Sequence, residues 1–245
     1  MNGPGQYREL PPFYDALMKN VPYGYWAEYI EKLFERYSFR PASVLDVACG
    51  TGTMTKAFAD MGMEAVGIDI SPGMTECAKS KYPGLEFLCR DAADFDLGRQ
   101  FDAAVSLFDS LNYITDRSRL QEAFRCVEKH LRPGGYFIFD MNTIYALSMD
   151  FFRQADLEGW PRYIWKPRWD PKTRLCEVDM TFEIKNEDGS ISEVKEKHIQ
   201  KGYRQKEILY MLGEASLSFV EAFDAYTFNK TNKRSDRIFY VARKD

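Results

Sequence analysis

The sequence predicts an α/β fold built on a mostly parallel, doubly wound sheet. Apolar runs typical of buried strands alternate with stretches typical of helices between about residues 44 and 142. The first of these runs, at residues 44–52, ends in two closely spaced glycines, which is typical of a strand turning sharply into a helix. Period-two stretches after residue 142 predict an antiparallel β insertion.

Length and composition are those of a globular protein. The 245 residues are 45% hydrophobic, enough for a sizeable core in one domain or in one domain with an elaboration. A net charge of −4 and a pI near 5.4 argue against a nucleic-acid partner. The five cysteines lack a regular spacing, so we expect reduced thiols in a cytoplasmic protein. We expect neither a signal peptide nor a membrane span.

The first forty residues are rich in aromatic side chains. Helical spacing from Trp26 to Tyr37 predicts one apolar face that packs on the sheet. Tyr7, Tyr14 and Tyr23 lie off that face, so we expect some of them to contact a ligand.

The elements of the core follow in order. Ser71 before Pro72 predicts a helix start, because serine caps the free N–H groups and proline suits the first turn. The predicted helices are 52–61, 72–81, 116–131 and 204–213. The predicted strands are 64–70, 85–89, 102–107, 135–141, 217–226 and 236–243. In the insertion, residues 175–184 and 191–196 flank an Asn-Glu-Asp-Gly turn and read as a hairpin.

Polar residues cluster where these strands end. Gly50 and Gly52 allow a ligand to approach the backbone more closely than a Cβ would permit. Asp69 ends the next strand, 17 positions after Gly52, the spacing at which a carboxylate meets ribose hydroxyls. Asp91 follows a third strand. In open α/β sheets these strand ends form one crevice for the ligand.

The motif Asp46-x-Ala48-x-Gly50-x-Gly52, with Asp69 and Asp91, resembles the class I S-adenosylmethionine-dependent methyltransferases over residues 40–142, with a tail at 204–243. The resemblance implies a seven-stranded sheet and S-adenosylmethionine as cofactor. It also implies that the glycine turn holds the methionine part, Asp69 the ribose and Asp91 the adenine. Ala48 departs from the usual glycine and should tighten the loop. The expected cofactor-binding residues are Tyr7, Tyr14, Tyr23, Trp26, Asp46, Ala48, Gly50, Gly52, Asp69, Ile70, Asp91, Ala92 and Phe108.

The same resemblance divides the chain into three parts. Residues 1–40 form a helical lid, residues 41–142 and 204–245 the cofactor domain, and residues 143–203 the β insertion over the acceptor site. The pattern looks most like bacterial small-molecule methyltransferases, including the glycine/sarcosine and amino-sugar N-methyltransferase types.

The acceptor is expected beside the stretch that follows the fourth strand. A sulfonium donor is already activated, so methyl transfer needs chiefly a positioned nucleophile and exclusion of water. We predict that Asp109, Asn112 and Tyr113 position the acceptor, and that no strong base is required. The histidines His130 and His198 read as a helix-end cation and a strand surface residue.

Several specific chemistries lack their residues. The chain has neither the Asn/Asp-Pro-Pro-aromatic motif of nucleic-acid amino methylation nor the Pro-Cys pair of pyrimidine carbon methylation. Metal-dependent catechol-type O-methyltransferases have adjacent Asp and Asn residues at the end of the fifth strand, whereas Met141 separates Asp140 from Asn142 here. This spacing weakens the case for that type of enzyme, and we expect no metal.

The sequence therefore favours a methyltransferase that acts on a nitrogen or oxygen atom of a small molecule, and we expect a monomer or homodimer. A catalytically silent S-adenosylmethionine-binding or regulatory protein stays open as an alternative. A nicotinamide-dependent oxidoreductase is less favoured, because residue 55 is threonine where a third glycine is wanted.

Overall fold

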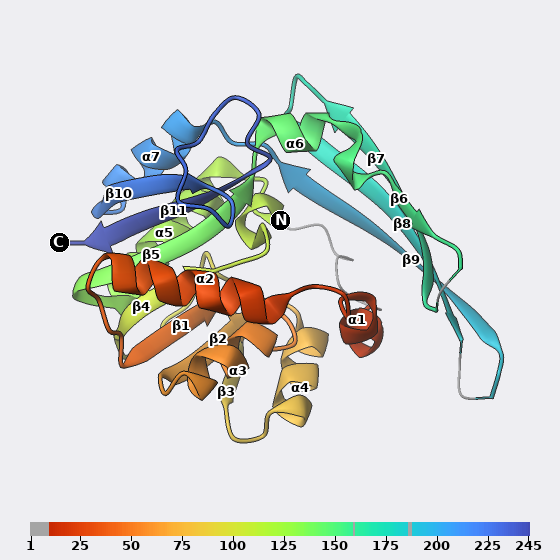
Figure 1. Cartoon of the computed structure of the whole chain (residues 1–245), viewed down its shortest axis with the longest axis horizontal. Helices are drawn as coiled ribbons and strands as arrows, with labels where there is room; N and C mark the ends of the chain where they lie inside the picture. Colours follow the sequence, from red (N-terminus) through yellow and green to blue (C-terminus); the bar gives the residue numbers. More distant parts are fainter. Residues whose placement is uncertain (1–9, 159, 186–187) are drawn as a thin grey trace.

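The computed structural model describes residues 10–158, 160–185 and 188–245, and it contains a large core sheet and a smaller insertion sheet (Figure 1). The core sheet has seven strands in the order β10-β11-β5-β4-β1-β2-β3. They are β1 (Ser43–Val47), β2 (Glu64–Asp69), β3 (Glu86–Cys89), β4 (Phe101–Ser106), β5 (Leu131–Asn142), β10 (Leu217–Asp224) and β11 (Arg237–Lys244). All pairs are parallel except those of β11 with β5 and β10. The predicted doubly wound fold is confirmed.

Helices cover both faces of the core sheet. Side chains of α2 (Tyr23–Arg36) and α3 (Thr53–Asp60) pack on one face, and those of α5 (Arg117–His130) and α7 (Gln205–Glu214) pack on the other. The chain changes direction between β1 and β4, and the ligand crevice of such sheets opens at this switch point.

Local chemistry accounts for the helix starts. The Ser71 hydroxyl accepts a hydrogen bond from the Met74 N–H at 3.3 Å and caps α4 (Pro72–Lys81), as predicted. The Asp116 carboxylate caps α5 in the same way, accepting from the Arg119 N–H at 3.0 Å. Other predicted boundaries shift by a few residues, and β5 starts at Leu131, directly after α5, rather than at 135.

The insertion is larger than the predicted hairpin. Strands β8 (Leu175–Lys185) and β9 (Ile191–Lys201) form that hairpin, but β6 (Gln154–Asp156) and β7 (Arg162–Asp170) extend it to four antiparallel strands in the order β6-β7-β8-β9. Helix α6 (Ile144–Ser148) and a 3₁₀ turn, η2 (Asp150–Phe152), connect it to the core sheet.

A short N-terminal helix joins the two sheets. Helix α1 (Pro11–Leu17) lies between the core and the insertion sheet (Figure 1). Leu10, Phe13 and Leu17 pack with the apolar face of β8. Within the described residues, no helix is long and apolar enough to cross a membrane, and all five cysteines are free thiols.

Candidate active site

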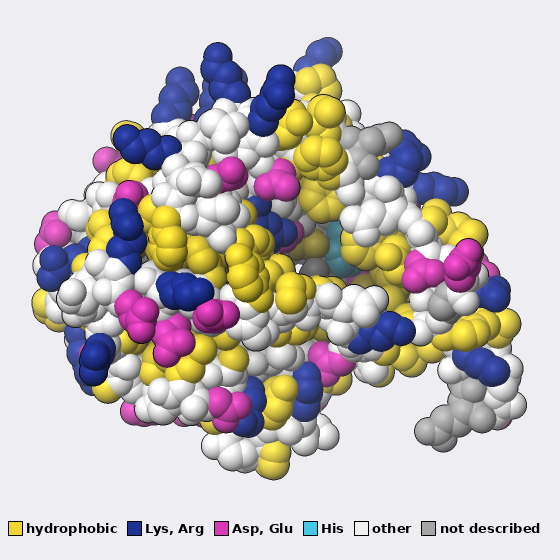
Figure 2. Space-filling view, in the orientation of Figure 1, with side chains coloured by type: hydrophobic (Ala, Val, Ile, Leu, Met, Phe, Trp, Pro, Cys, Tyr) yellow, Lys and Arg dark blue, Asp and Glu magenta, His cyan; other side chains and the backbone are white. Residues whose placement is uncertain are grey.

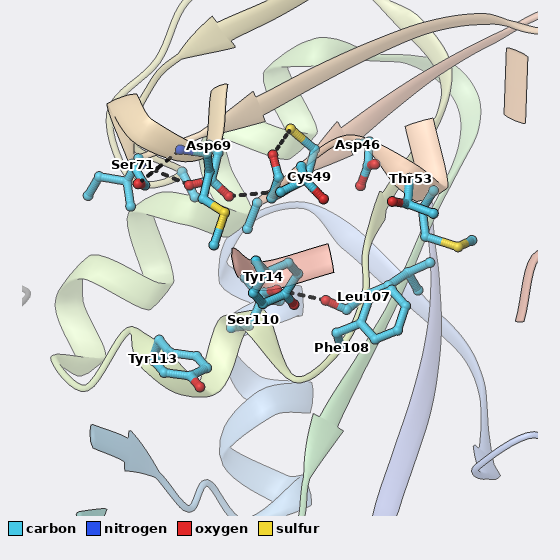
Figure 3. Close-up of a pocket in the computed structure, with 18 of the residues that line it drawn as sticks. Tyr14, Asp46, Cys49, Thr53, Asp69, Ser71, Leu107, Phe108, Ser110 and Tyr113 are labelled. Atoms are coloured by element: carbon cyan, nitrogen blue, oxygen red, sulfur yellow. Dashed lines mark hydrogen bonds between the residues drawn. The ribbon is translucent and has the colours of Figure 1, made fainter. Parts of the chain in front are cut away.

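A cavity of about 460 Å³ opens at the carboxyl ends of β1, β2 and β4. Figure 2 shows the surface hollowed between the core and the insertion, and Figure 3 shows Asp46 and Asp69 on one side of the cavity with Tyr14, Phe108 and Tyr113 on the other. The predicted site residues that line it are Tyr14, Tyr23, Asp46, Ala48, Gly50, Asp69, Ile70, Asp91, Ala92, Phe108 and Tyr113. Gly52, Trp26, Asp109 and Asn112 are not among its lining residues, and Tyr7 lies outside the described residues.

The turn after β1 places its backbone against the cavity. Ala48, Gly50 and Gly52 all have left-handed backbone, with φ of 62°, 56° and 78°. A Cβ on Gly50 would meet nothing within 4 Å, so the space beside this cavity-lining backbone is open to a ligand. Gly52 has a different role, because its Cβ would lie 2.5 Å from the Phe87 ring. Gly52 thus lets the turn pack on β3.

Asp69 is held by the same turn. Its two carboxylate oxygens accept from the Gly50 N–H at 2.9 Å and from the Ser71 N–H at 2.8 Å. Each oxygen has two acceptor sites, so the carboxylate retains capacity for ligand hydroxyls. Burial raises the pKa of Asp69, and the two N–H donors oppose that rise.

Asp46 lies under the turn. It is buried, and the Thr55 hydroxyl donates to one of its oxygens at 2.6 Å. Burial raises the pKa of Asp46 to about 7, which the Thr55 hydrogen bond opposes. A cationic ligand in the cavity would therefore meet a carboxyl group that ionises near neutral pH.

Asp91 is fixed at the edge of the cavity. One carboxylate oxygen forms an ion pair with Arg119 in the first turn of α5, and the other accepts from the Ala93 N–H at 2.9 Å. The adjoining Ala92 and Ile70 supply apolar lining at this end.

The opposite wall is the loop after β4. Phe108 and Asp109 have positive φ, and the 3₁₀ helix η1 (Ser110–Tyr113) follows. Asp109 forms an ion pair with Arg237 at 2.5 Å and accepts a hydrogen bond from Gln200. The Asn112 amide donates to the Asn142 and Lys201 carbonyls at 3.0 and 2.9 Å, and its oxygen accepts from the Asn142 N–H at 2.9 Å. Both side chains thus fasten the loop from behind the cavity wall.

Tyr113 lines the cavity, and its hydroxyl lies 3.0 Å from His198 Nδ1. His198 Nε2 in turn lies 2.8 Å from Glu196 Oε2. The predicted surface position of His198 is wrong, because this side chain is only 2% exposed. The sequence carries a signal for it: Glu196, His198 and Gln200 alternate along β9, so they share the face that Val194 turns toward the core.

The second histidine also differs from its predicted state. His130 ends α5 but is buried, and its Nε2 accepts from the Leu97 N–H at 2.9 Å. Its Nδ1 therefore carries the proton and donates to the Cys126 carbonyl at 2.7 Å. His130 is a neutral structural residue and not a helix-end cation.

Known proteins agree with this geometry. Residues 44–135 match a family described as "Methyltransferase domain". The chain is 30% identical over 160 residues to the uncharacterized methyltransferase OB1106 of Oceanobacillus iheyensis, covering 62% of this chain and 71% of the relative. A solved S-adenosylmethionine-dependent methyltransferase from Clostridium acetobutylicum is 27% identical with a TM-score of 0.84, covering 94% of this chain and 96% of that one. The chain belongs to the class I S-adenosylmethionine-dependent methyltransferases.

A further relative of this methyltransferase has a named substrate. The dTDP-3-amino-3,4,6-trideoxy-alpha-D-glucopyranose N,N-dimethyltransferase of Streptomyces venezuelae is 34% identical over 119 residues, which covers 49% of this chain and 47% of the relative.

S-adenosylmethionine is the cofactor of this methyltransferase, and the cavity fits it. The open backbone at Gly50 and the carboxylates of Asp46 and Asp69 suit a ligand with hydroxyls and positive charge. Among the residues that the structure describes, no group of three or more His, Cys, Asp or Glu side chains is placed to hold a metal ion.

Aromatic side chains of the methyltransferase close the cavity from the N-terminal side. Tyr14 of α1 and Tyr23 of α2 are hydrogen-bonded partners, and the Tyr23 ring centroid lies 5.1 Å from that of Phe108. Burial raises the pKa of Tyr14 well above its ordinary value. Trp26 does not line the cavity but packs behind Phe108. The centroid of its ring lies 3.8 Å from that of Phe108 and 4.9 Å from that of Tyr226.

Proposed function

We propose that this methyltransferase transfers the cofactor's methyl group to a nitrogen or oxygen atom of a small-molecule acceptor. One observation carries the proposal: Asp69 and Tyr113, which lie on opposite walls, line a single cavity. Cofactor and acceptor can therefore meet in one cavity, whose walls can orient the acceptor and displace water from it.

Within this proposal the walls have separate tasks. The glycine turn and Asp46 hold the methionine part, Asp69 binds the ribose, and Asp91 with Ala92 binds the adenine. Phe108 and Tyr113 contact the acceptor, while Asp109 and Asn112 act indirectly by fixing their loop. The lid and the insertion cover the acceptor end. The bound cofactor would supply an activated methyl group, so the protein's main task at this step is to orient and desolvate the acceptor.

A nitrogen acceptor is the finer proposal. Support comes from the Streptomyces venezuelae relative, whose name describes dimethylation of an amino sugar. The cavity volume of about 460 Å³ and the net charge of −4 favour a small molecule over a nucleic acid.

The alternatives differ in what they require. Thr55, where a dinucleotide fingerprint would have glycine, is buried and donates its hydroxyl to Asp46, so this position is part of the turn's support. A catalytically silent cofactor-binding protein would share the residues proposed to bind the cofactor, here called the cofactor wall (Asp46, Gly50, Asp69 and Asp91). It would not methylate any acceptor.

Turnover tests the proposal directly. The protein is incubated with methyl-labelled S-adenosylmethionine and a panel of amines, phenols and carboxylates, and transfer of label is measured. We expect at least one amine to be methylated. Binding of the cofactor with no acceptor methylated anywhere in the panel would favour the silent alternative.

Asp69→Ala is the matched test of the cofactor wall. We expect its dissociation constant for S-adenosylmethionine, measured by calorimetric titration, to rise about tenfold to a hundredfold, because a charge-assisted contact is lost. Asp60→Ala, on the exposed end of α3, is the control and should bind as the wild type does. An unchanged constant for Asp69→Ala would contradict the assignment.

A further inference from the structure

A chain of polar side chains leads from the cavity into the insertion. Tyr113 lines the cavity, His198 lies behind it, and Glu196 lies behind His198, with distances of 3.0 and 2.8 Å between the bonded atoms. His198 and Glu196 are 2% and 6% exposed. Burying two ionisable side chains costs free energy unless they are partnered. Apolar residues would cost less at these positions of the sheet, so the presence of His198 and Glu196 indicates a role in the cavity's chemistry.

The hydrogen bonds assign the protons. The Leu10 N–H donates to Glu196 Oε1 at 3.1 Å, and Glu196 Oε2 lies 2.8 Å from His198 Nε2. An ionised carboxylate has only acceptor sites, so an ionised Glu196 accepts at both oxygens. His198 Nε2 therefore carries the ring proton, and Nδ1 offers its lone pair to the Tyr113 O–H. This order of carboxylate, imidazole and hydroxyl draws a proton away from the hydroxyl.

We propose that Tyr113, backed by His198 and Glu196, receives a proton from the methyl acceptor. This proposal rests on the proposed function and deepens it, because it names the acceptor class: a molecule whose attacking nitrogen or oxygen carries a proton, such as an alkylammonium ion or a hydroxyl. Tyr113 is the catalytic residue, and His198 and Glu196 are positioning residues that act through it.

The step balances as follows for a hydroxyl acceptor. The acceptor oxygen forms the bond to the methyl carbon as the carbon–sulfur bond breaks and the sulfur keeps that electron pair. The acceptor's proton passes to Tyr113 Oη, and Tyr113's own proton passes to His198 Nδ1. Glu196 compensates the resulting imidazolium charge. For an ammonium acceptor the same transfer frees the nitrogen lone pair before attack. Solvent then takes the proton from His198 through Tyr113 when product leaves.

Titratable side chains from several elements lie around this wall of the cavity. Tyr14 of α1 interacts electrostatically with Tyr113, with Asp109 of the loop after β4 and with Asp69. Asp109 is neutralised by Arg237, and Lys201 on β9 donates to the Thr115 carbonyl at 3.0 Å. Within the described residues, Tyr113, His198 and Glu196 thus form a relay that connects a cavity-lining hydroxyl to a buried carboxylate.

The first experiment measures the relay without turnover. The two histidines are labelled with nitrogen-15 in the full chain, and their ring nitrogens are followed by NMR at neutral pH. We expect His198 to show a protonated Nε2 and an unprotonated, hydrogen-bonded Nδ1, and we expect Tyr113→Phe to shift the Nδ1 signal. A proton on Nδ1 in the wild type would overturn the relay, whatever the fate of the proposed function.

The second experiment measures turnover against pH with an acceptor found in the panel. We expect Tyr113→Phe to lower kcat about hundredfold with unchanged cofactor affinity. His198→Gln and Glu196→Gln should lower kcat at neutral pH, and their rates should recover as pH rises and the acceptor loses its proton unaided. Equal losses at every pH would show a merely structural role and overturn the proposal.

Tyr240→Phe is the matched control, because this buried tyrosine lies in the core of the sheet away from the cavity. It should leave the pH profile unchanged. If the His198 or Glu196 variant fails to fold, Tyr113→Phe still decides the matter, since it removes one oxygen atom and keeps the ring.

Discussion

Two residues of the turn after β1 show how closely side-chain size is limited there. Gly52 has φ of 78°, and a Cβ would lie 2.5 and 2.6 Å from two atoms of the Phe87 ring. We expect Gly52→Ala to lower the free energy of unfolding by about 2–4 kcal/mol, because left-handed strain and overpacking add. Urea unfolding measures the change.

Ala48→Gly is the natural control for that variant. Ala48 already adopts φ of 62°, so glycine would relieve strain but increase the entropy of the unfolded chain. We expect these effects to cancel to within about 0.5 kcal/mol. If Gly52→Ala were as mild as Ala48→Gly, the close packing of this turn on β3 would be incorrect.

Asp46 makes stability depend on pH. Its pKa in the folded protein is about 7, whereas an unfolded aspartate ionises near 4. The folded state thus holds a proton that the unfolded state loses, so this contribution to stability is complete below about pH 4 and disappears as pH rises toward 7. We expect Asp46→Asn to become more stable relative to the wild type by up to about 4 kcal/mol between pH 4 and 8.

Urea unfolding of both proteins at several pH values measures this difference, with the exposed Asp60→Asn as control. A difference between wild type and Asp46→Asn that stays constant with pH would rule out the raised pKa.

At the scale of elements, one buried cation joins three of them. Arg237 of β11 forms ion pairs with Asp140 of β5 and with Asp109 of the loop after β4. Burial alone would lower the pKa of Arg237, but the attraction of the two carboxylates raises it. The strand pair and the acceptor loop are therefore fixed relative to each other by one side chain.

Replacing Arg237 leaves the carboxylates of Asp109 and Asp140 without their ion-pair partner. We expect Arg237→Met to lower the free energy of unfolding by about 3–5 kcal/mol. Arg36→Met, which breaks the exposed pair with Glu221, should cost far less, because solvent already screens that pair. Both are read from urea unfolding curves, and a similar, small loss for the two variants would refute the structural role of Arg237.

The elements of the core could be predicted because their signals are local. Strand periodicity, the glycine turn and the Ser71 cap each act over a few residues, and Asp46, Gly50 and Asp69 follow from strand ends that are neighbours in the sheet. No separate strand was predicted at β7, since Pro167 interrupts its pattern, or at β6, which has only three residues, all exposed.

The acceptor wall was harder to predict, because its contacts are distant in sequence. Tyr113 and His198 are 85 residues apart, and Asp109 and Arg237 are 128 apart. A side chain such as Asn112 looks available in the sequence and proves to be tied to backbone groups of β5 and β9. Only the placement of the insertion on the core shows which polar residues reach the cavity.

At the scale of the whole molecule, α1 connects the two walls of the cavity. On the core side, Asp15 accepts from the Thr51 hydroxyl at 2.7 Å and pairs with Lys81 at 2.5 Å. On the insertion side, the Leu10 N–H donates to Glu196, the last member of the relay. One short helix thus touches the cofactor turn, lines the cavity through Tyr14 and supports the relay.

Deleting residues 1–22 should therefore abolish turnover while the core stays folded. Helix α2 begins at Tyr23, and the core packing of Ile30 and Leu33 does not involve α1. The insertion loses the cover that Leu10, Phe13 and Leu17 give it, so we expect hydrogen exchange to rise in β8 and β9 but not in β1 and β4. Cofactor affinity should fall as well, because Tyr14 is removed from the cavity. Asp15→Ala, which frees only the core side of α1, should reduce affinity and turnover less than the deletion does. A truncated protein that methylates its acceptor as fast as the full chain would show that the enclosed cavity is not what makes transfer possible.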